Sequence, residues 1–310
     1  MNMSENKKVS SNSAKTENFV PTFGQRLGYR IALAMGGLGF GGIRKLGLSL
    51  GWLLWTVLPE RRRLATNNIY RHLGYLPSRS REIARASFDH NARSFVESVL
   101  TPRFGADNPR FVLERPDVLE RLRQADRPVV VASGHMGAWE LFASLWGLFP
   151  AERPRITVVR KYKNAMLNYL SSQLRSSWGA QTIGHREAVF PVLRALRKKG
   201  CVAFLVDHNT SRDEAIFLPF LGEEAAVNRG PALIAVRSNA LVCPIFLLRD
   251  KDKYVLCMEE PLDPLELQGT SEEKIEAVTR FYTAAVERIV RRAPEQWFWM
   301  HNRWKTKKRA

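Results

Sequence analysis

Hydrophobic and polar positions fall into blocks along the chain, and each block predicts a different kind of element. A polar stretch over residues 1–18 precedes a long apolar region that runs from Ile31 to Leu58. Residues 61–100 then show helical periodicity, with many arginines on the face opposite the apolar one. From about residue 126, short apolar runs alternate with amphipathic stretches. That rhythm predicts an α/β domain whose strands are joined by crossover helices.

The pattern gives approximate bounds for these elements and divides the chain into five parts. The expected strands cover residues 128–133, 155–160, 201–206, 241–248 and 253–259. The expected helices cover residues 138–148, 164–177, 187–199, 229–238 and 271–292. The five parts are a disordered polar tail (1–18), a membrane-associating helical segment (19–60), a helical subregion (61–125), an α/β core (126–305) and a basic tail (306–310).

The apolar region near the N-terminus differs from a secretory signal and from a single membrane span. It starts late and lacks a small-residue cleavage site. Arg44 and Lys45 divide it into two pieces, each shorter than the roughly 20 apolar residues that a span needs. We therefore expect two helices that dip into a membrane interface, with Trp52 and Trp55 as anchors. One tilted span and a buried hairpin are the alternatives.

Composition adds a constraint on partners. The chain has 310 residues, of which 45% are hydrophobic, enough for a substantial core. Its formal net charge is +18, an excess that implies an anionic partner. The candidates are a membrane surface, a nucleic acid, a phosphorylated substrate and an acidic carrier protein.

The cysteines and glycines exclude several classes of site. Cys201, Cys243 and Cys257 lie in or beside apolar runs without C-x-x-C spacing. They are typical of small core residues in a reducing compartment, which argues against a disulfide framework and a zinc site. The glycines near residue 36 follow no expected strand, so they do not indicate a dinucleotide-binding loop.

The segment PVVVASGHMGAWE (128–140) carries the strongest chemical signal. An expected buried strand ends at a Ser-Gly turn, His135 follows, and Glu140 comes five residues later where a new helix is expected. Strand ends of this kind present side chains to ligands. A histidine with a nearby carboxylate can act as a general base. The alternative is a structural histidine beside a surface glutamate. Since no Ser or Cys stands in a nucleophile-elbow pattern, we expect the base to activate a substrate hydroxyl.

Three further places carry polar residues that could contact a ligand or a partner. Arg160, Lys163 and Asn164 follow the second expected strand, just before a helix. Asp207 ends the third expected strand, where it can orient a partner, bind a cation or cap a loop. Arg229 precedes a helix, where a cation opposes the macrodipole and so suggests an anionic ligand or partner.

The segment PEQWFWMHNRWK (294–305) concentrates aromatic and basic residues. Such a composition suits lipid headgroups and also single-stranded nucleic acid. The membrane-like region near the N-terminus favours lipid.

Taken together, these segments resemble the bacterial lipid A late acyltransferases, the lauroyl/myristoyl transferase family within the lysophospholipid-acyltransferase-like superfamily. The resemblance rests on an ordered set of motifs: GHMGAWE (134–140), VVRKYKNAMLNYL (158–170), VDHN (206–209), LPFLG (218–222), NRGPALIA (228–235) and PEQWFWMHNRWK (294–305). It implies a glycerolipid-acyltransferase-like fold, with a central mixed, mostly parallel sheet flanked by helices. His135 and Glu140 match the family's His-x4-Asp/Glu dyad and would be its catalytic pair.

The resemblance also implies substrates and a location. The donor would be acyl carrier protein, with acyl-CoA as the runner-up, and the acceptor an anionic lipid A precursor at the cytoplasmic face of the bacterial inner membrane. No metal, redox cofactor or nucleic acid is implied. Our candidate substrate-binding residues are Arg160, Lys163, Asn164, Asp207, Arg229, Trp299, His301 and Arg303.

Two other functions stay open at this point. One is a related acyltransferase that acts on another amphiphile, such as a mannosylated phosphoinositide or an amino-acid lipid. The other is a non-catalytic basic protein that binds membranes or nucleic acid, against which the intact His135 and Glu140 argue.

Overall fold

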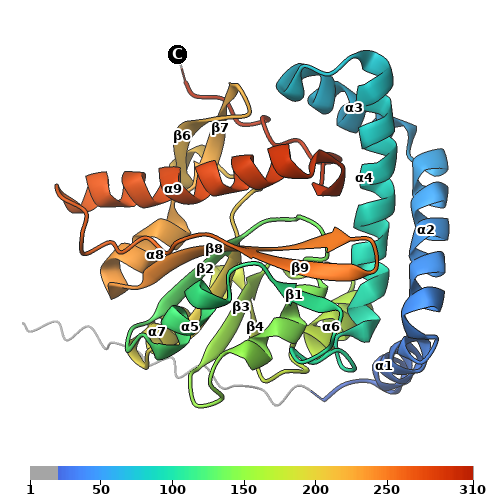
Figure 1. Ribbon diagram of the computed structural model, residues 1–310, viewed down its shortest axis with the longest axis horizontal. Helices are drawn as coiled ribbons and strands as arrows, with labels where there is room; N and C mark the ends of the chain where they lie inside the picture. The colour runs from blue at the N-terminus through green and yellow to red at the C-terminus, as the bar shows by residue number, and fades with distance from the viewer. Residues whose placement is uncertain (1–19, 310) are drawn as a thin grey trace, which may run out of the picture.

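A computed structural model describes residues 20–309, so the predicted polar tail lies outside the described residues. Its centre is a seven-stranded sheet with the order β1-β9-β8-β2-β5-β3-β4, beside a two-stranded sheet, β6-β7 (Figure 1). The strands are β1 (Phe111–Leu113), β2 (Val129–Ser133), β3 (Arg155–Val159), β4 (Gln181–Gly184), β5 (Cys201–Leu205), β6 (Ala215–Phe220), β7 (Glu223–Asn228), β8 (Leu241–Asp250) and β9 (Lys253–Met258).

The strand directions confirm the expected α/β class. β2 pairs in parallel with β5 and β8, β3 pairs in parallel with β4 and β5, and β1 pairs in parallel with β9. In the large sheet only β8 and β9 pair antiparallel, as a hairpin. A mostly parallel sheet must be covered on both faces, which explains the apolar runs along its central strands.

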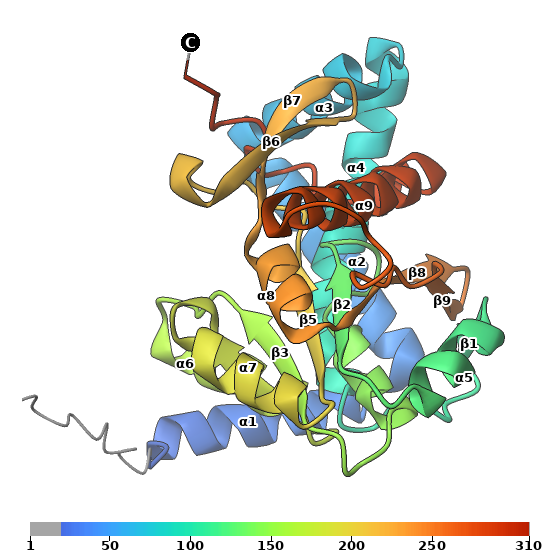
Figure 2. The same ribbon diagram turned by 90° about the vertical axis from the view of Figure 1, so that its left-hand side faces the viewer.

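Helices cover both faces of this sheet (Figures 1 and 2). They are α1 (Phe23–Gly36), α2 (Gly39–Val57), α3 (Pro59–Leu73), α4 (Pro77–Glu97), α5 (Pro116–Gln124), α6 (Ala165–Arg175), α7 (Val189–Arg197), α8 (Gly230–Ser238) and α9 (Ser271–Arg292). Alternate residues of β2 enter two separate cores. Val130 and Ala132 pack in a core with α7, α8 and α9, whereas Val129 and Val131 pack in a core with α5 and the segment after β2.

Several elements differ from the sequence expectation. β1 and β4 are too short to give a periodic signal, and the β6–β7 hairpin contains Pro219 and two glutamates, which hide its strand character. The helix expected over 138–148 is a 3-10 helix over Leu141–Leu148. It starts late because Gly137, at φ +59°, keeps the preceding residues in a tight loop.

The apolar region near the N-terminus forms α1 and α2, which meet at a sharp bend. Among residues 20–309, no helix taken singly has the length and apolar character to cross a bilayer. Only α1 and α2 together pass that test of length and composition, and they are bent by 112°. The membrane-associating role of residues 19–60 therefore stays a prediction.

Two glycines bring α2 into close contact with α4. A Cβ atom built on Gly47 would lie 2.9 Å from the Cα atom of Arg93, and one built on Gly51 would lie 2.7 Å from the Cα atom of Asp89. Gly47 and Gly51 are four residues apart, so they share one helix face. The glycines that weaken α2 as an isolated helix are thus what allow its backbone to pack on α4.

We expect Gly51→Leu to lower the free energy of unfolding by about 1–3 kcal/mol, because the added side chain must push α2 away from α4. Gly41→Leu is the matched control, since a Cβ atom on Gly41 of the same helix meets nothing within 4 Å. The measurement is the denaturation midpoint of the two variants in the same detergent. Equal midpoints for both variants would contradict the close packing.

Candidate active site

The candidate site lies at the carboxyl edge of the sheet, where β2 and β5 end side by side. The two strands are parallel, with Ser133 opposite Leu205. His135 and Asp207 each lie two residues after the last residue of their strand, so they meet at the same edge. The Nδ1 atom of His135 lies 2.9 Å from the Oδ1 atom of Asp207. The backbone N–H of His135 also donates to Oδ2 of Asp207, at 2.8 Å.

A third donor completes the surroundings of the Asp207 carboxylate. The indole N–H of Trp297 donates to Oδ2 of Asp207 at 2.9 Å, and both side chains are buried. Burial alone would raise the pKa of Asp207, but the charge of His135 and the hydrogen bonds from His135 and Trp297 outweigh it and hold the pKa below its ordinary value. Asp207 is therefore an ionised carboxylate at neutral pH.

This carboxylate sets the tautomer of His135. An ionised carboxylate only accepts hydrogen bonds, so Nδ1 of His135 carries the proton and Nε2 keeps its lone pair. Burial lowers the pKa of His135, but the charge and hydrogen bond of Asp207 more than offset it, so the pKa lies above its ordinary value. The side chain of His135 is 31% exposed. The site thus presents a basic nitrogen to an incoming group.

Aromatic rings surround the imidazole. Its centroid lies 5.6 Å from the ring of Trp139 and 6.0 Å from the ring of Phe298. Trp139 in turn contacts Phe95 of α4 edge-on, at 5.5 Å. Phe95 is among the exposed large apolar side chains. The imidazole therefore has an apolar surround that continues to the molecular surface, a setting suited to a long hydrocarbon chain.

The loop that carries His135 is fixed from three sides. The backbone N–H groups of Gly137 and Ala138 donate to Gln296 and Leu247, at 3.0 and 2.8 Å. The hydroxyl of Ser94 on α4 donates to the carbonyl of Gly137 at 3.1 Å. A Cβ atom on Gly137 would lie 2.1 Å from the carbonyl oxygen of Leu247, so only glycine fits there.

The predicted contact between Glu140 and the imidazole is replaced by a different pairing. Both carboxylate oxygens of Glu140 accept from Arg175 on α6, at 2.8 and 2.5 Å. The physical reason is the loop at Gly137, which turns Glu140 toward α6, whereas β5 delivers Asp207 directly to His135. Glu140 still acts on His135 from a distance, because its charge helps to raise the pKa of the imidazole.

The residues predicted after β3 have separate roles. Asn164 is the N-cap of α6, and its side chain accepts from the backbone N–H of Leu167 at 3.0 Å. Arg160 and Lys163 are exposed. Because β3 pairs in parallel with β5, Arg160 leaves the sheet at the same edge as Asp207. Of the three, Arg160 has the position and the freedom to reach a ligand near His135.

The other predicted residues make contacts within the protein, and their binding of a substrate stays a prediction. Arg229 forms an ion pair with Glu272, so its anionic partner belongs to the protein itself. The indole N–H of Trp299 donates to the carbonyl of Pro294 at 2.7 Å. Arg303 is buried, donates to the carbonyl of Ala226 at 2.6 Å and stacks over the ring of Phe220 at 5.2 Å.

His301 lies between these structural residues and the site. Its Nε2 atom accepts from the backbone N–H of Asn209, at 3.3 Å, two residues after Asp207. Burial lowers the pKa of His301 to about 4, so its ring is neutral near pH 7. It braces the segment around residue 208 and places an uncharged imidazole near the site.

Sequence reasoning missed two residues that shape the site. Arg175 lies in the last turn of an ordinary amphipathic helix, which gave no signal. Trp297 lies in the aromatic segment 294–305, and the composition of that segment suggested a lipid interface. In the structure the indole is buried and donates to Asp207. An expectation that buried indole N–H groups find acceptors could have pointed to a carboxylate partner.

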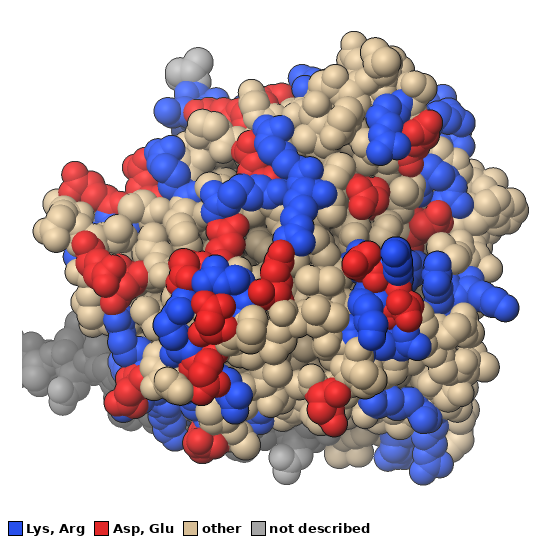
Figure 3. All heavy atoms as spheres, in the orientation of Figure 1, with Lys and Arg blue, Asp and Glu red and all other residues tan. Residues whose placement is uncertain are grey.

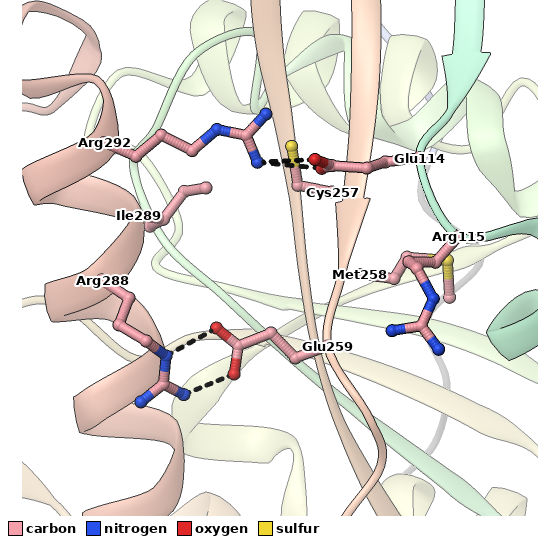
Figure 4. Close-up of a pocket in the computed structure, with 8 residues that line it drawn as sticks. All are labelled: Glu114, Arg115, Cys257, Met258, Glu259, Arg288, Ile289 and Arg292. Atoms are coloured by element: carbon pink, nitrogen blue, oxygen red, sulfur yellow. Dashed lines mark hydrogen bonds and ion pairs between the residues drawn. The ribbon is translucent and has the colours of Figure 1, made fainter.

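A separate cavity of about 300 Å³ lies between α9 and β9 (Figure 4). Arg292 pairs with Glu114, and Arg288 pairs with Glu259, across it. Burial raises the pKa of Cys257 on its wall to about 12, which makes the thiol unreactive. Acidic and basic side chains are likewise intermixed on this face of the molecule (Figure 3). The charges of the two arginines across the cavity are therefore balanced by Glu114 and Glu259.

Comparisons with known proteins point to one family. The profile of the family described as bacterial lipid A biosynthesis acyltransferase matches residues 14–306. A lipid A biosynthesis acyltransferase of Haemophilus influenzae is 25% identical over 277 residues, covering 86% of this chain and 85% of the relative. A lipid A biosynthesis palmitoleoyltransferase of Escherichia coli is 26% identical over 271 residues, covering 84% of each.

A relative with a different acceptor in its name is similar to the chain as well. The phosphatidylinositol mannoside acyltransferase of Mycolicibacterium smegmatis is 24% identical over 292 residues, covering 85% of this chain and 92% of the relative.

The Glu140–Arg175 pair is buried, with side chains 5% and 13% exposed, and this leads to a stability prediction. We expect Glu140→Gln to lower the free energy of unfolding by about 3 kcal/mol, because it leaves the Arg175 charge buried without its partner. The double variant Glu140→Leu/Arg175→Leu should lose less, since it buries no lone charge. Denaturant titration of both variants measures the difference. A double variant as unstable as the single one would contradict this account.

Proposed function

Because this chain belongs to the bacterial lipid A biosynthesis acyltransferase family, we propose that it moves a fatty acyl chain from a carrier thioester to a lipid A precursor, with His135 as the general base. Family membership makes it an O-acyltransferase of lipid A synthesis. The observation that supports the mechanism is the partly exposed imidazole of His135, whose Nδ1 is held by Asp207 so that Nε2 keeps its lone pair.

The chemical step follows from this arrangement. Nε2 of His135 takes the proton of the acceptor hydroxyl as its oxygen attacks the thioester carbonyl carbon. The buried Asp207 stabilises the imidazolium that forms. The tetrahedral intermediate then expels the carrier's thiolate, which receives the proton from His135. The products are an ester on the acceptor and a free carrier thiol.

The intermediate also needs a donor for its oxyanion. The backbone N–H groups of residues 135–138 already donate to Asp207, Gly134, Gln296 and Leu247. These four amides are therefore used within the protein. Arg160, at the same sheet edge and exposed, is our candidate for stabilising the oxyanion.

Glu140 enters the proposal as a positioning residue. Its ion pair with Arg175 ties the end of the His135 loop to α6. The guanidinium of Arg175 also lies 5.9 Å from the ring centroid of Tyr162, just after β3. The His135 loop and the segment after β3 are thereby held together, and the negative charge of Glu140 adds to that of Asp207 on the imidazole.

The donor, acceptor and location are part of the same proposal. The net charge of +18 suits anionic substrates, namely acyl carrier protein as donor, with acyl-CoA as the runner-up, and an anionic glycolipid as acceptor. Exposed apolar side chains on α1 and α2, among them Phe23, Ile31 and Trp52, support binding to the cytoplasmic face of the inner membrane. Lys163 lies exposed near Arg160 and is a further candidate for contact with the anionic substrates.

The mannoside acyltransferase relative supports a second candidate acceptor, a mannosylated phosphoinositide. The catalytic arrangement would be the same, because the base acts on a hydroxyl in either case. Purified enzyme offered both acceptors with the same acyl thioester separates the two, with the products identified by mass.

His135→Ala should reduce transfer to a lipid A precursor by about 10²–10⁴-fold, because the positioned base is lost. The assay uses purified protein, an acyl carrier thioester and mass detection of the acylated lipid. The circular dichroism spectrum should stay that of the wild type, while the thermal midpoint should fall, because the buried Asp207 loses one of its three N–H donors and keeps the other two. Full activity in a folded His135→Ala protein would disprove the role of the base.

The raised pKa of His135 sets the pH dependence of the rate. The neutral ring is the active form, so activity should fall as the pH drops through a pKa above 6.5. Asp207→Asn removes the charge that raises this pKa, so the acid limb should move to lower pH. The same change removes the carboxylate that holds the proton of His135 on Nδ1, and it should lower kcat by about 10²–10⁴-fold. An acid limb that stays in place in Asp207→Asn would contradict the pairing.

A further inference from the structure

Three arginines from two helices gather around Trp55 in the last turn of α2, and a fourth, Arg61, is next to Arg62 in α3. We call Trp55, Arg61, Arg62, Arg81 and Arg85 the Trp55 arginine cluster. The guanidinium carbons of Arg62, Arg81 and Arg85 lie 5.4, 5.8 and 5.8 Å from the centroid of the Trp55 ring. Cation–π attraction of this kind holds guanidinium groups in place while leaving their N–H donors available. The cluster is therefore an ordered set of donors.

The indole that organises the cluster is itself fixed by the core. Trp55 packs edge-on against the buried ring of Phe88 on α4, with centroids 5.2 Å apart. Since α2 and α4 are in close contact through Gly51, Trp55 and the two α4 arginines cannot separate without unpacking these helices.

The positive charge of the cluster exceeds the negative charge around it. Within residues 20–309, Arg85 is the one cluster arginine that pairs with a carboxylate, that of Asp89, at 2.6 Å. Arg61 and Arg62 donate instead to the backbone carbonyls of Met300 and Trp55, at 3.2 and 3.5 Å. Like charges held this close repel one another, and a bound anion would relieve the repulsion.

The start of α3 also favours a bound anion. Arg61 and Arg62 lie in its first turn, where positive charge opposes the helix macrodipole. The N-cap, Leu58, makes no side-chain hydrogen bond to the helix, and Glu60 is the acidic residue in that turn. Pro59 has no N–H and the N–H of Arg62 donates to Leu58, so the backbone N–H groups of Glu60 and Arg61 and the arginines would together bind an oxyanion.

Contacts along the chain connect the cluster to the catalytic histidine. Arg61 donates to Met300, the residue before His301, and Asn68 of α3 donates to the carbonyl of Trp299 at 3.2 Å. His301 accepts from Asn209, two residues after Asp207. The cluster is thus attached to the same C-terminal segment that supplies Trp297 and Phe298 to the site.

We propose that the Trp55 arginine cluster binds a phosphate group of the acceptor glycolipid and so fixes which part of the acceptor reaches His135. This inference rests on the proposed function. Guanidinium groups suit phosphate because each can donate two parallel hydrogen bonds. The acceptor is favoured over bulk anionic lipid because the cluster is attached to the C-terminal segment of the site.

The test compares two acceptors that differ only in the presence of the phosphate. The proteins are the full chain, Arg62→Gln, Arg81→Gln and the control Arg237→Gln, which removes an exposed charge from the last turn of α8. Binding of each acceptor in detergent is followed by tryptophan fluorescence, and transfer by mass. We expect each cluster variant to weaken binding of the phosphorylated acceptor about tenfold, with a matching rise in KM and a kcat within twofold. The control and the dephosphorylated acceptor should show no change.

The possible outcomes separate this inference from the proposed function. Equal effects on both acceptors, or no effect on either, would overturn the phosphate site while leaving transfer to the wild type intact. Vesicles of phosphatidylcholine with or without phosphatidylglycerol form the second arm. Variants that lose binding to the anionic vesicles but keep the preference for the phosphorylated acceptor would assign the cluster to bulk lipid and also overturn the inference. Phosphate-dependent binding without any acyl transfer would support the cluster and reject the proposed function.

Discussion

The site depends on one buried carboxylate that is surrounded by three N–H donors. Asp207 accepts from the ring and the backbone of His135 and from the indole of Trp297. A lone carboxylate in this place would be costly to bury, and these donors offset that cost while keeping the group ionised. The ionised carboxylate in turn fixes the proton of His135 on Nδ1, and so the chemistry at Nε2 follows from the burial of Asp207.

The fold brings these groups together from three distant parts of the chain. Parallel pairing of β2 and β5 places His135 and Asp207 at one sheet edge, and the segment after α9 returns to the same edge with Trp297. Gly137 lets the His135 loop approach β8 more closely than any other residue could. Ser94 then connects the loop to α4, so the site, the helices near the N-terminus and the C-terminal segment are one packed unit.

Much of this could be predicted from the sequence, and the failures have physical causes. The alternation of apolar runs and amphipathic stretches predicted the α/β class, and the strand ends predicted that His135 and Asp207 face the site. Their contact could not be predicted, because it depends on the order of strands in the sheet, which sequence patterns do not give. Glu140 was the nearest carboxylate in sequence, but the loop at Gly137 turns it toward Arg175. The glycines of α2 weakened the helix signal, although Gly51 is what brings α2 onto α4.

The state of the His135 ring is the most direct test of the central claim. Nitrogen NMR of histidine-labelled protein, with the His135 signals assigned by a His135→Gln variant, reports the tautomer and the pKa of that ring together. Above its pKa the neutral ring should carry its proton on Nδ1 and leave Nε2 bare, and the pKa should lie above 6.5. A neutral ring with its proton on Nε2, or a pKa below 6.5, would contradict the pairing with Asp207.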